Sequence, residues 1–325
     1  MKRRQYKYFS LKVVKDSKTR SGARRINVSA ADRYHRKRYK IERQAVKIFA
    51  NGLQRYLVKR PNKDSKSKIN VARSLTYLAP AMRAWAQYMP GGFATYHVHN
   101  PERMQIKNGK KLDYITKMLF RHSYDGRGLR SRSYAMAWWL HQNITEKSNG
   151  IRWASIACGT GQPTFDASAV FKYPTHYLLI DSDQEALSFA QKLAKSYDID
   201  SNRLTLRQLN VTSQKRELED ELKLFAPDCI DAMGLLEYLS DRDAASLLNH
   251  LYRQLPKGGL LVFTNMLDSH PHLEVHKRAL CWPGVNVRSE ADVLNLLKSA
   301  DIPAKATTIL LPDDGVYGVY GVEKQ

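Results

Sequence analysis

The pattern of apolar and polar positions changes at about Gly150. After this glycine, short apolar runs alternate with stretches whose apolar residues recur at helical spacing. The expected strands are residues 152–157, 176–181, 203–210, 229–234, 259–266, 305–311 and 316–323. The expected helices are residues 184–197, 241–255 and 289–300. Strands that alternate with helices in this way predict an α/β fold with a parallel sheet covered on both faces.

The last two expected strands depart from this alternation. Only PDDG, residues 312–315, separates them, which is too short for a crossover helix. We therefore expect a closing antiparallel hairpin in an otherwise mostly parallel sheet.

The first half of the chain predicts helices and little else. Residues 1–30 show little periodicity and are expected to be a mobile basic tail. A helix is expected over residues 31–60, and PNKDSKSK (61–68) indicates a linker. Its apolar stripe is Ile41, Ala45, Phe49, Leu53 and Tyr56. Further helices are expected at residues 70–89, 111–121 and 131–147, with a glycine-bearing basic loop at 123–132.

These boundaries predict three parts. Residues 1–68 form the basic tail, helix and linker, residues 69–149 a helical N-terminal or lid region, and residues 150–325 the α/β domain. The 325 residues are enough for one large domain or two smaller ones.

Charge is distributed very unevenly over a chain whose formal net charge is +22. Residues 1–70 hold 23 Lys and Arg against 4 Asp and Glu, whereas residues 151–325 hold 18 against 23. Such asymmetry favours contact of residues 1–60 with nucleic acid or an anionic surface, and a solubilising tail is the alternative.

Other totals limit the class of protein. No apolar run is long enough to span a bilayer, and the basic N-terminus lacks the apolar core of a secretory signal. The three cysteines, Cys158, Cys229 and Cys281, are too few for a disulfide framework and lack metal-ligand spacing. We expect a soluble, cytoplasmic protein.

The most informative stretch is IACGTGQPT, residues 156–164, at the end of an expected strand. Gly159 and Gly161 allow the main chain to approach a ligand closely, because they carry no Cβ. Asp181 ends the next expected strand, where a carboxylate can accept hydrogen bonds from both hydroxyls of a ribose. Neither phosphate-binding glycine motif is present, so the turn favours a nucleoside without phosphates.

Five motifs in this order resemble class I S-adenosylmethionine-dependent methyltransferases. They are SIACGTG (155–161), LLIDSD (178–183), QLNV (208–211), CIDAMGLLEYL (229–239) and LPKGGLLVFTN (255–265). The resemblance covers residues 150–325 and implies a Rossmann-like sheet whose last strand is reversed. It also implies that S-adenosylmethionine is the cofactor and that the protein is an enzyme.

The resemblance assigns cofactor contacts by motif position. Ala157, Cys158, Gly159, Thr160 and Gly161 are expected to line the methionine moiety, and Asp181 to hold the ribose. Asn210 and Val211 are expected to flank the adenine, with Met233 and Gly234 beneath the sulfonium. Ser155 and Ala157 stand where many members carry an acid and a glycine.

A narrower resemblance concerns ACGTG, MGLLEYLSDRDAASLL and DGRGLRSR (125–132). These stretches are similar to bacterial methyltransferases grouped with fatty-acid methyl ester biosynthesis. The similarity implies that DGRGLRSR folds over the cofactor, so that Arg130 or Arg132 pairs with the methionine carboxylate. An ordinary solvated loop is the alternative.

Candidate catalytic residues lie at the end of the fifth expected strand of the domain and just after it. Asn265 and His270 are the candidates for a base or an acceptor-positioning group, on location alone. His270, His272 and His276 also invite a metal site, but Pro271 interrupts them and no second cluster supplies ligands, so no metal is expected.

Three functions are consistent with these features. The first is methyl transfer to a carboxylate or hydroxyl of a small or lipid-like molecule, because the motifs of adenine and cytosine methylation are missing after residue 232. The second is an RNA methyltransferase that grips phosphates through its basic arm. The third is a non-catalytic nucleic-acid-binding protein on the same scaffold. We favour the first, since net charge indicates partners and not chemistry.

Overall fold

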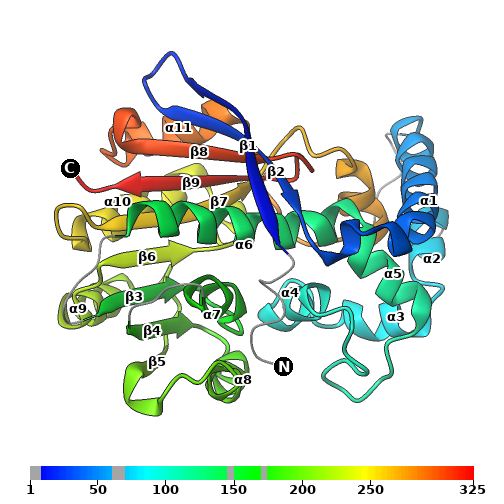
Figure 1. The fold of residues 1–325 in the computed structure, drawn as a ribbon, viewed down its shortest axis with the longest axis horizontal. Coiled ribbons are helices and arrows are strands. Elements are labelled where there is room, and N and C mark those ends of the chain that lie inside the picture. Colours follow the sequence, from blue (N-terminus) through cyan, green and yellow to red (C-terminus); the bar gives the residue numbers. More distant parts are fainter. Residues whose placement is uncertain (1–8, 61–69, 145–149, 170–173) are drawn as a thin grey trace.

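A single nine-stranded sheet organises the computed structural model, which describes residues 9–60, 70–144, 150–169 and 174–325 (Figure 1). The strand order is β1-β2-β8-β9-β7-β6-β3-β4-β5. The strands are β1 (Ser10–Lys18), β2 (Arg24–Ala31), β3 (Ile151–Ile156), β4 (Thr175–Asp181), β5 (Leu204–Gln208), β6 (Cys229–Ala232), β7 (Leu260–Met266), β8 (Thr307–Pro312) and β9 (Tyr317–Glu323).

Helices cover both faces of this sheet and one of its ends. They are α1 (Lys40–Val58), α2 (Val71–Thr76), α3 (Pro80–Ala86), α4 (Gly92–His99), α5 (Tyr114–His122), α6 (Tyr124–Asn143), α7 (Gln162–Ser168), α8 (Gln184–Lys195), α9 (Lys215–Phe225), α10 (Asp241–Gln254) and α11 (Glu290–Ser299). Two shorter turns matter for the site, the 3₁₀ turn η5 (Leu236–Tyr238) and the π-helical turn η6 (Val275–Leu280).

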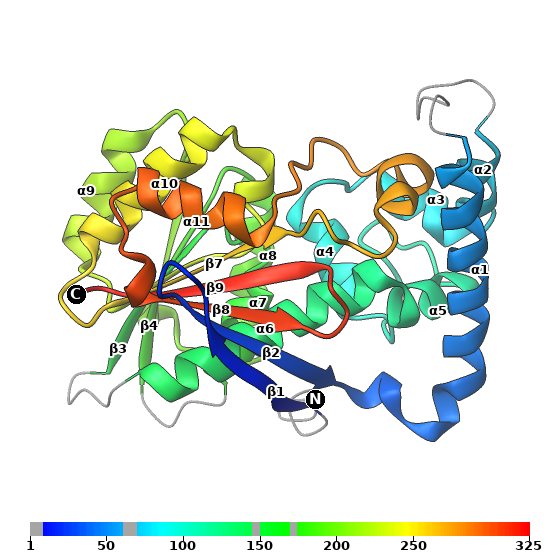
Figure 2. The same cartoon turned by 90° about the horizontal axis from the view of Figure 1, so that it is seen from above.

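The α/β part of the chain has the expected Rossmann-like fold. All seven strands expected after residue 150 are present, and β3 pairs in parallel with both β4 and β6. One core packs α9, α10 and α11 on one face of the sheet, and a second packs α6, α7 and α8 on the other (Figure 2). The strand order reverses between β3 and β6, and ligands of open α/β sheets bind at such a switch.

The closing hairpin is also confirmed. Strand β9 runs antiparallel to β8 and to β7, where Leu260 pairs with Glu323 and Met266 with Tyr317. Every residue of β7 is buried, as expected for a central strand that has neighbours on both sides and helices on both faces.

The prediction of a mobile tail is wrong for the described residues after Phe9. Strands β1 and β2 form a hairpin, and β2 joins the sheet in parallel with β8. Ile26, Val28 and Ala30 are buried and alternate with more exposed polar residues, so the strand has the usual period of two. The alternation is hard to see among so many basic residues. β1 is the exposed edge, and its lysines discourage further strand pairing.

Helix α1 is shorter than predicted, and its buried face is rotated. Val46, Ala50, Leu53 and Leu57 are buried, whereas Ile41 of the predicted stripe is 83% exposed. The predicted linker, residues 61–68, lies outside the described residues. The helix expected over 70–89 is two helices, because Pro80 begins α3 at a position where a missing N–H costs nothing.

The loop expected at residues 123–132 is instead the first half of α6. This helix begins at Tyr124 behind the Ser123 cap and runs to Asn143. Its glycines permit close packing and do not break the helix. A Cβ at Gly126 would lie 2.2 Å from the carbonyl oxygen of Phe120, and one at Gly128 would lie 2.5 Å from Cβ of Val316. Helices α1 to α5 lie beyond one end of the sheet, and α6 runs from them across a face of the sheet (Figure 1).

Candidate functional site

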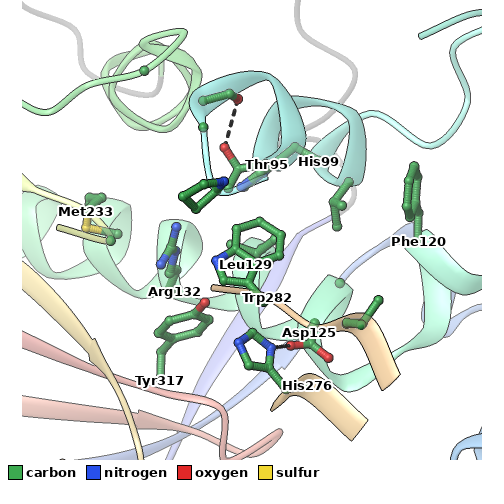
Figure 3. Close-up of a pocket in the computed structure, with 18 of the residues that line it drawn as sticks. Thr95, His99, Phe120, Asp125, Leu129, Arg132, Met233, His276, Trp282 and Tyr317 are labelled. Atoms are coloured by element: carbon green, nitrogen blue, oxygen red, sulfur yellow. Dashed lines mark hydrogen bonds and ion pairs between the residues drawn. The ribbon is translucent and has the colours of Figure 1, made fainter. Parts of the chain in front are cut away.

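A cavity of about 440 Å³ lies beyond the carboxyl ends of β3, β4 and β6. Its floor comes from the turns after these three strands, and its walls come from α1, α3, α4, α5, α6 and η6 (Figure 3). The volume lies in the usual range of small-molecule sites, and the position is the switch point of the sheet.

The turn after β3 is shaped by residues with positive φ. Ala157, Gly159 and Gly161 have φ of 52°, 55° and 68°. Ala157 and Gly159 line the cavity, whereas Gly161 precedes α7 as its N-terminal cap residue. Gly92, at the start of α4, closes over the turn so tightly that a Cβ there would lie 2.6 Å from Cα of Gly159. The two glycines therefore bring the helical layer directly onto the turn.

Asp181 ties the turn to the end of β4. Its Oδ2 accepts a hydrogen bond of 2.6 Å from the backbone N–H of Gly159, and its Oδ1 accepts one of 2.9 Å from that of Asp183. The carboxylate also lines the cavity. Burial raises the pKa of Asp181 above its ordinary value, despite these hydrogen bonds. A ligand hydroxyl that donates to Asp181 would replace the hydration that the carboxylate loses.

The cavity brings together most, but not all, of the cofactor residues predicted from the sequence. Besides Ala157, Gly159 and Asp181, it is lined by Cys158, Thr160, Met233 and Gly234. Asn210 and Val211 are not among the lining residues. The side chain of Asn210 accepts hydrogen bonds from Thr212 in its own turn, and Val211 is buried in the core on the α10 side.

Arg130 lies away from the cavity, which corrects its predicted role as a cofactor ligand. Its Nε donates to Asp32 at 2.7 Å, and its two terminal nitrogens donate to the carbonyls of Phe120 and Arg121. These partners fix the end of α5 and the segment after β2. The neighbouring possibility, Arg132, does line the cavity, because it lies about half a helical turn away on α6.

Arg132 belongs to a small polar cluster within an otherwise apolar wall. Its Nη1 lies 3.5 Å from Oε1 of Glu237, and its guanidinium lies 4.4 Å from the ring centre of Tyr317. Gly234 leaves room for it, since a Cβ there would lie 2.9 Å from both terminal nitrogens. Burial raises the pKa of Glu237, and burial with the charges of Arg132 and Arg130 lowers the pKa of His99 to about 3.

Several polar atoms of this cluster are buried without a hydrogen-bond partner among the described residues. They are Nε and Nη1 of Arg132, Oε2 of Glu237 and Nε2 of His99. Buried polar groups in native proteins are nearly always satisfied by protein, water or ligand. The unpaired donors and acceptors therefore fit a polar ligand group next to Gly234.

Asp231, which the sequence analysis missed, supplies a carboxylate beside the turn. It accepts hydrogen bonds from Trp153 Nε1 at 2.7 Å, Ser155 Oγ at 2.9 Å and Thr164 Oγ1 at 3.0 Å. Burial raises its pKa to about 6. An acid is thus present next to Ser155, although it comes from the neighbouring strand β6. Only strand pairing reveals this, because the two residues are 76 positions apart.

A second polar cluster joins α6 to η6. Nδ1 of His276 lies 2.5 Å from Oδ1 of Asp125, and Nε2 of His270 lies 3.5 Å from the same oxygen. Burial opposes ionisation of Asp125, but His276 and His270 hold its pKa well below the ordinary range. His272 points elsewhere, since its Nε2 lies 2.8 Å from Oδ1 of Asn51.

This cluster groups metal-ligand atom types, because one atom each of Asp125, His270 and His276 lies within 4.8 Å of the others. The hydrogen bonding opposes a metal. The backbone N–H of His272 donates to Nδ1 of His270 at 2.9 Å, so Nδ1 carries the lone pair and Nε2 carries the proton of the neutral ring. A metal on Nε2 of His270 would require the opposite tautomer.

The two catalytic candidates named from the sequence have structural roles. Asn265 is fully buried, accepts a hydrogen bond from Arg288 and donates to the carbonyls of Met266 and Asn286. Asn265 thus holds the segment after β7, which corrects its predicted role as a base or acceptor-positioning group. His270 lies behind Asp125 and is not a lining residue. His276 does line the cavity.

The remaining wall is apolar. It includes Val46, Ala50 and Leu53 of α1, Met82 and Trp85 of α3, Leu119 and Phe120 of α5, Leu129 of α6, and Trp282. Figure 3 shows Leu129, Phe120 and Trp282 around the space that His276 and Arg132 also border. The site thus has a polar floor at the strand ends and an apolar chamber above it.

A family model described as methyltransferase domain matches residues 154–261, which contain the turn, Asp181 and the β6 turn. The chain therefore contains a methyltransferase domain. Its cofactor is S-adenosylmethionine, and the cavity fits such a molecule, because backbone without Cβ atoms, a buried carboxylate and unpaired polar groups all border it. No curated protein sequence matches the chain.

Solved structures similar to this methyltransferase are distant in sequence. A protein described as a possible exported protein from Bordetella parapertussis is 14% identical, with a TM-score of 0.59 over 86% of this chain and 96% of its own. Magnesium protoporphyrin IX methyltransferase from Synechocystis, with bound S-adenosylhomocysteine, is 12% identical, with a TM-score of 0.49 over 75% of this chain and 99% of its own. The first of these supports the fold. Within the described ranges, no helix is both long and apolar enough to cross a membrane.

Proposed function

We propose that this methyltransferase transfers a methyl group to a carboxylate or hydroxyl of a small or lipid-like molecule held in the apolar chamber. The observation that carries the proposal is the continuity of one cavity from the glycine turn to the wall of α1, α3 and α5. A chamber of this kind removes apolar surface from water, which favours a hydrophobic acceptor.

The cofactor would lie on the polar floor. Ala157 to Thr160 would border its amino-acid part, and Asp181 would accept hydrogen bonds from the ribose hydroxyls. Met233 and Gly234 would lie beneath the reacting centre. Arg132, with unpaired donors beside Gly234, is the group suited to a carboxylate at this place. When bound, the cofactor supplies an electrophilic methyl group on a positively charged sulfur.

The chain itself then supplies position and exclusion of water. The close approach of Gly92 to Gly159 and the aromatic side chains Trp85, Phe120 and Trp282 enclose the acceptor. Alignment of the two reactants and a dry site account for a large part of the rate in such displacements. A polar acceptor group would meet Arg132, Glu237 or His276 at the border between floor and chamber.

Nucleic acid as the acceptor is the weaker alternative. Several basic residues of the N-terminal segment make internal contacts. Arg24 pairs with Asp16 on the neighbouring strand, and Arg25 pairs with Glu290 of α11 at 2.7 Å. These arginines attach the β1–β2 hairpin to the rest of the protein. Part of the positive charge of this segment is therefore paired within the protein and is not available to bind phosphates.

The test is transfer of label from methyl-labelled S-adenosylmethionine to an extract of the source cells. Label that moves into organic solvent and resists nucleases would support the proposal. Label that stays in water and is released by ribonuclease would overturn it in favour of RNA. Asp181→Ala should abolish transfer in either case. Its matched control is Asp200→Ala, which replaces an exposed acid outside the cavity.

A further inference from the structure

His276 occupies an unusual position in the cavity wall. It lies in η6, a π-helical turn, and such turns are rare and frequently found at functional sites. Its ring is buried, and Trp282 stacks beside it with an angle of 28° between the ring planes. The ring is therefore held at Nδ1 by Asp125, and the residue borders the cavity.

The contact with Asp125 decides which nitrogen carries the proton. Asp125 is ionised, since its pKa is held well below the ordinary range, and a carboxylate can only accept a hydrogen bond. Nδ1 of His276 is therefore the donor across the 2.5 Å contact (Figure 3). In the neutral ring, Nε2 then carries the lone pair.

Nε2 of His276 is buried and has no hydrogen-bond partner among the residues that the structure describes. An unpaired acceptor in a buried wall is costly unless a donor from a ligand meets it. Nε2 of His270 lies 3.5 Å from the same oxygen of Asp125, without a hydrogen bond between them. Of the two imidazoles beside this carboxylate, His276 is the one that borders the cavity.

We infer that His276 is the general base of the reaction and that the methyl acceptor is a hydroxyl group. Asp125 is a positioning residue that fixes the tautomer and stabilises the imidazolium once the proton has moved. The inference rests on the proposed function and narrows it, because a hydroxyl is chosen over a carboxylate.

The chemistry explains this choice. A carboxylate is already ionised near neutral pH and reacts as a nucleophile without a base, whereas a hydroxyl keeps its proton. In the step, the acceptor oxygen forms the new bond to the methyl carbon while the carbon–sulfur bond breaks. Its proton passes to Nε2 of His276, and the electron pair of the broken bond stays on sulfur. Charge is balanced, since the sulfonium becomes neutral and the imidazole becomes positive.

The acceptor hydroxyl also has a defined neighbourhood. Arg132 and Tyr317 lie between Met233, at the cofactor floor, and His276 (Figure 3). The apolar residues Leu129 and Trp282 border the same space. We therefore expect an apolar, ring-sized molecule that carries one hydroxyl close to Nε2.

The proton transfer depends on the groups that surround His276. The charged and titratable groups around His276 belong to several elements. They are Asp125 and Arg132 on α6, His99 on α4, Glu237 on η5, Tyr317 on β9, His270 and His272 before η6, and Glu274, Lys277 and Arg278 at η6. Asp125 is the only one of these with a hydrogen bond to the His276 ring among the described residues.

The experiment compares the wild type with His276→Gln and Asp125→Asn, and uses His250→Gln as the control. His250 lies on α10, outside the cavity, and its Nε2 is likewise unpaired. Labelled product from the source extract is treated with alkali, which releases volatile methanol from methyl esters but not from methyl ethers. Calorimetric titration with S-adenosylhomocysteine measures cofactor binding, and long-range proton–nitrogen NMR on the ligand-free protein reports the tautomer of His276.

The expected result is alkali-stable label, a loss of rate of about 10²–10⁴-fold in His276→Gln, and unchanged affinity for S-adenosylhomocysteine. Asp125→Asn should also slow the reaction, since the negative charge that stabilises the imidazolium is removed. Alkali-labile label, a wild-type rate in His276→Gln, or a proton on Nε2 in the neutral ring would each overturn the inference. Absence of any transferred label from the wild type would instead refute the proposed function.

Discussion

The replacement Asp181→Ala tests the cofactor site most directly. The carboxylate has two roles in the structure, because it accepts backbone hydrogen bonds from Gly159 and Asp183 and borders the cavity. The variant should lose affinity for S-adenosylhomocysteine, which contains the same ribose as the cofactor. It should also lose some stability, because the turn loses its link to β4.

The magnitudes follow from hydrogen bonds to a charged acceptor. Each contributes about 1.5–3 kcal/mol, so two ribose hydroxyls correspond to about 3–6 kcal/mol and to a dissociation constant about 10²–10⁴-fold higher. Loss of the acceptor for the Gly159 N–H costs about 1–3 kcal/mol in the free energy of unfolding. Part of this cost is offset, since burial disfavours the ionised form of Asp181 and raises its pKa.

Calorimetric titration with S-adenosylhomocysteine and urea unfolding separate the two effects. Asp200→Ala is the matched control, because Asp200 is exposed and its side chain pairs, among the described residues, with Arg203 in its own turn at 3.2 Å. Circular dichroism should first establish that the variant is folded at the temperature of the titration. A folded Asp181→Ala variant whose dissociation constant stays within about twofold of the wild type would refute the assignment, since even one lost charged hydrogen bond exceeds this limit.

Three further predictions concern stability. The pKa of Asp231 is raised to about 6, so this group stabilises the fold below about pH 4 and the contribution is lost as the pH rises through about 6. The unfolding free energy of Asp231→Asn minus that of the wild type should therefore increase by up to about 3 kcal/mol between pH 4 and pH 7. A difference that stays constant with pH in urea unfolding would contradict this. Gly128→Ala should lower the free energy of unfolding by about 1–3 kcal/mol, because its Cβ would lie 2.5 Å from Val316 in the β8–β9 hairpin. Gly52→Ala in α1, whose Cβ would have nothing within 4 Å, should raise it by about 0.4–1 kcal/mol. Equal melting temperatures of the two variants would disprove the packing argument. Arg130→Met should cost about 3–5 kcal/mol, since it removes the guanidinium from the buried Asp32, which retains its contacts with the Tyr34 N–H and with His35. The folded variant should bind S-adenosylhomocysteine normally, and weakened binding would restore a cofactor role for this arginine.

Prediction from the sequence succeeded where one local pattern determines the structure. Strands such as β4 and β7 are buried on both faces and therefore appear as continuous apolar runs. The hairpin of β8 and β9 follows from a connection too short for a crossover. The turn at Gly159 and the acid at Asp181 follow from the requirement that backbone and carboxylate approach a ligand, which only a few residue types can meet.

Prediction failed where one pattern is compatible with two structures. Glycines in DGRGLRSR indicated a loop, but Gly126 and Gly128 are in α6 because neighbouring elements leave no room for a Cβ. In β2, arginines obscured an alternation that the buried Ile26 and Val28 now make plain. The apolar stripe predicted for α1 differs from the face that is buried, because several faces of this helix carry apolar residues. Which face is buried depends on the elements that pack against the helix.

The sequence by itself determined the class of fold, the glycine turn with its acid, and hence the kind of cofactor. These features are local, because each lies within one strand and the turn that follows it. Only the tertiary structure decided how the acceptor side of the site is built. It brought Asp125 to His276 across 151 positions, and Trp153, Ser155 and Thr164 to Asp231. Hydrogen bonds between residues so far apart depend on which elements pack together, and that choice is made by the buried surfaces of the whole chain.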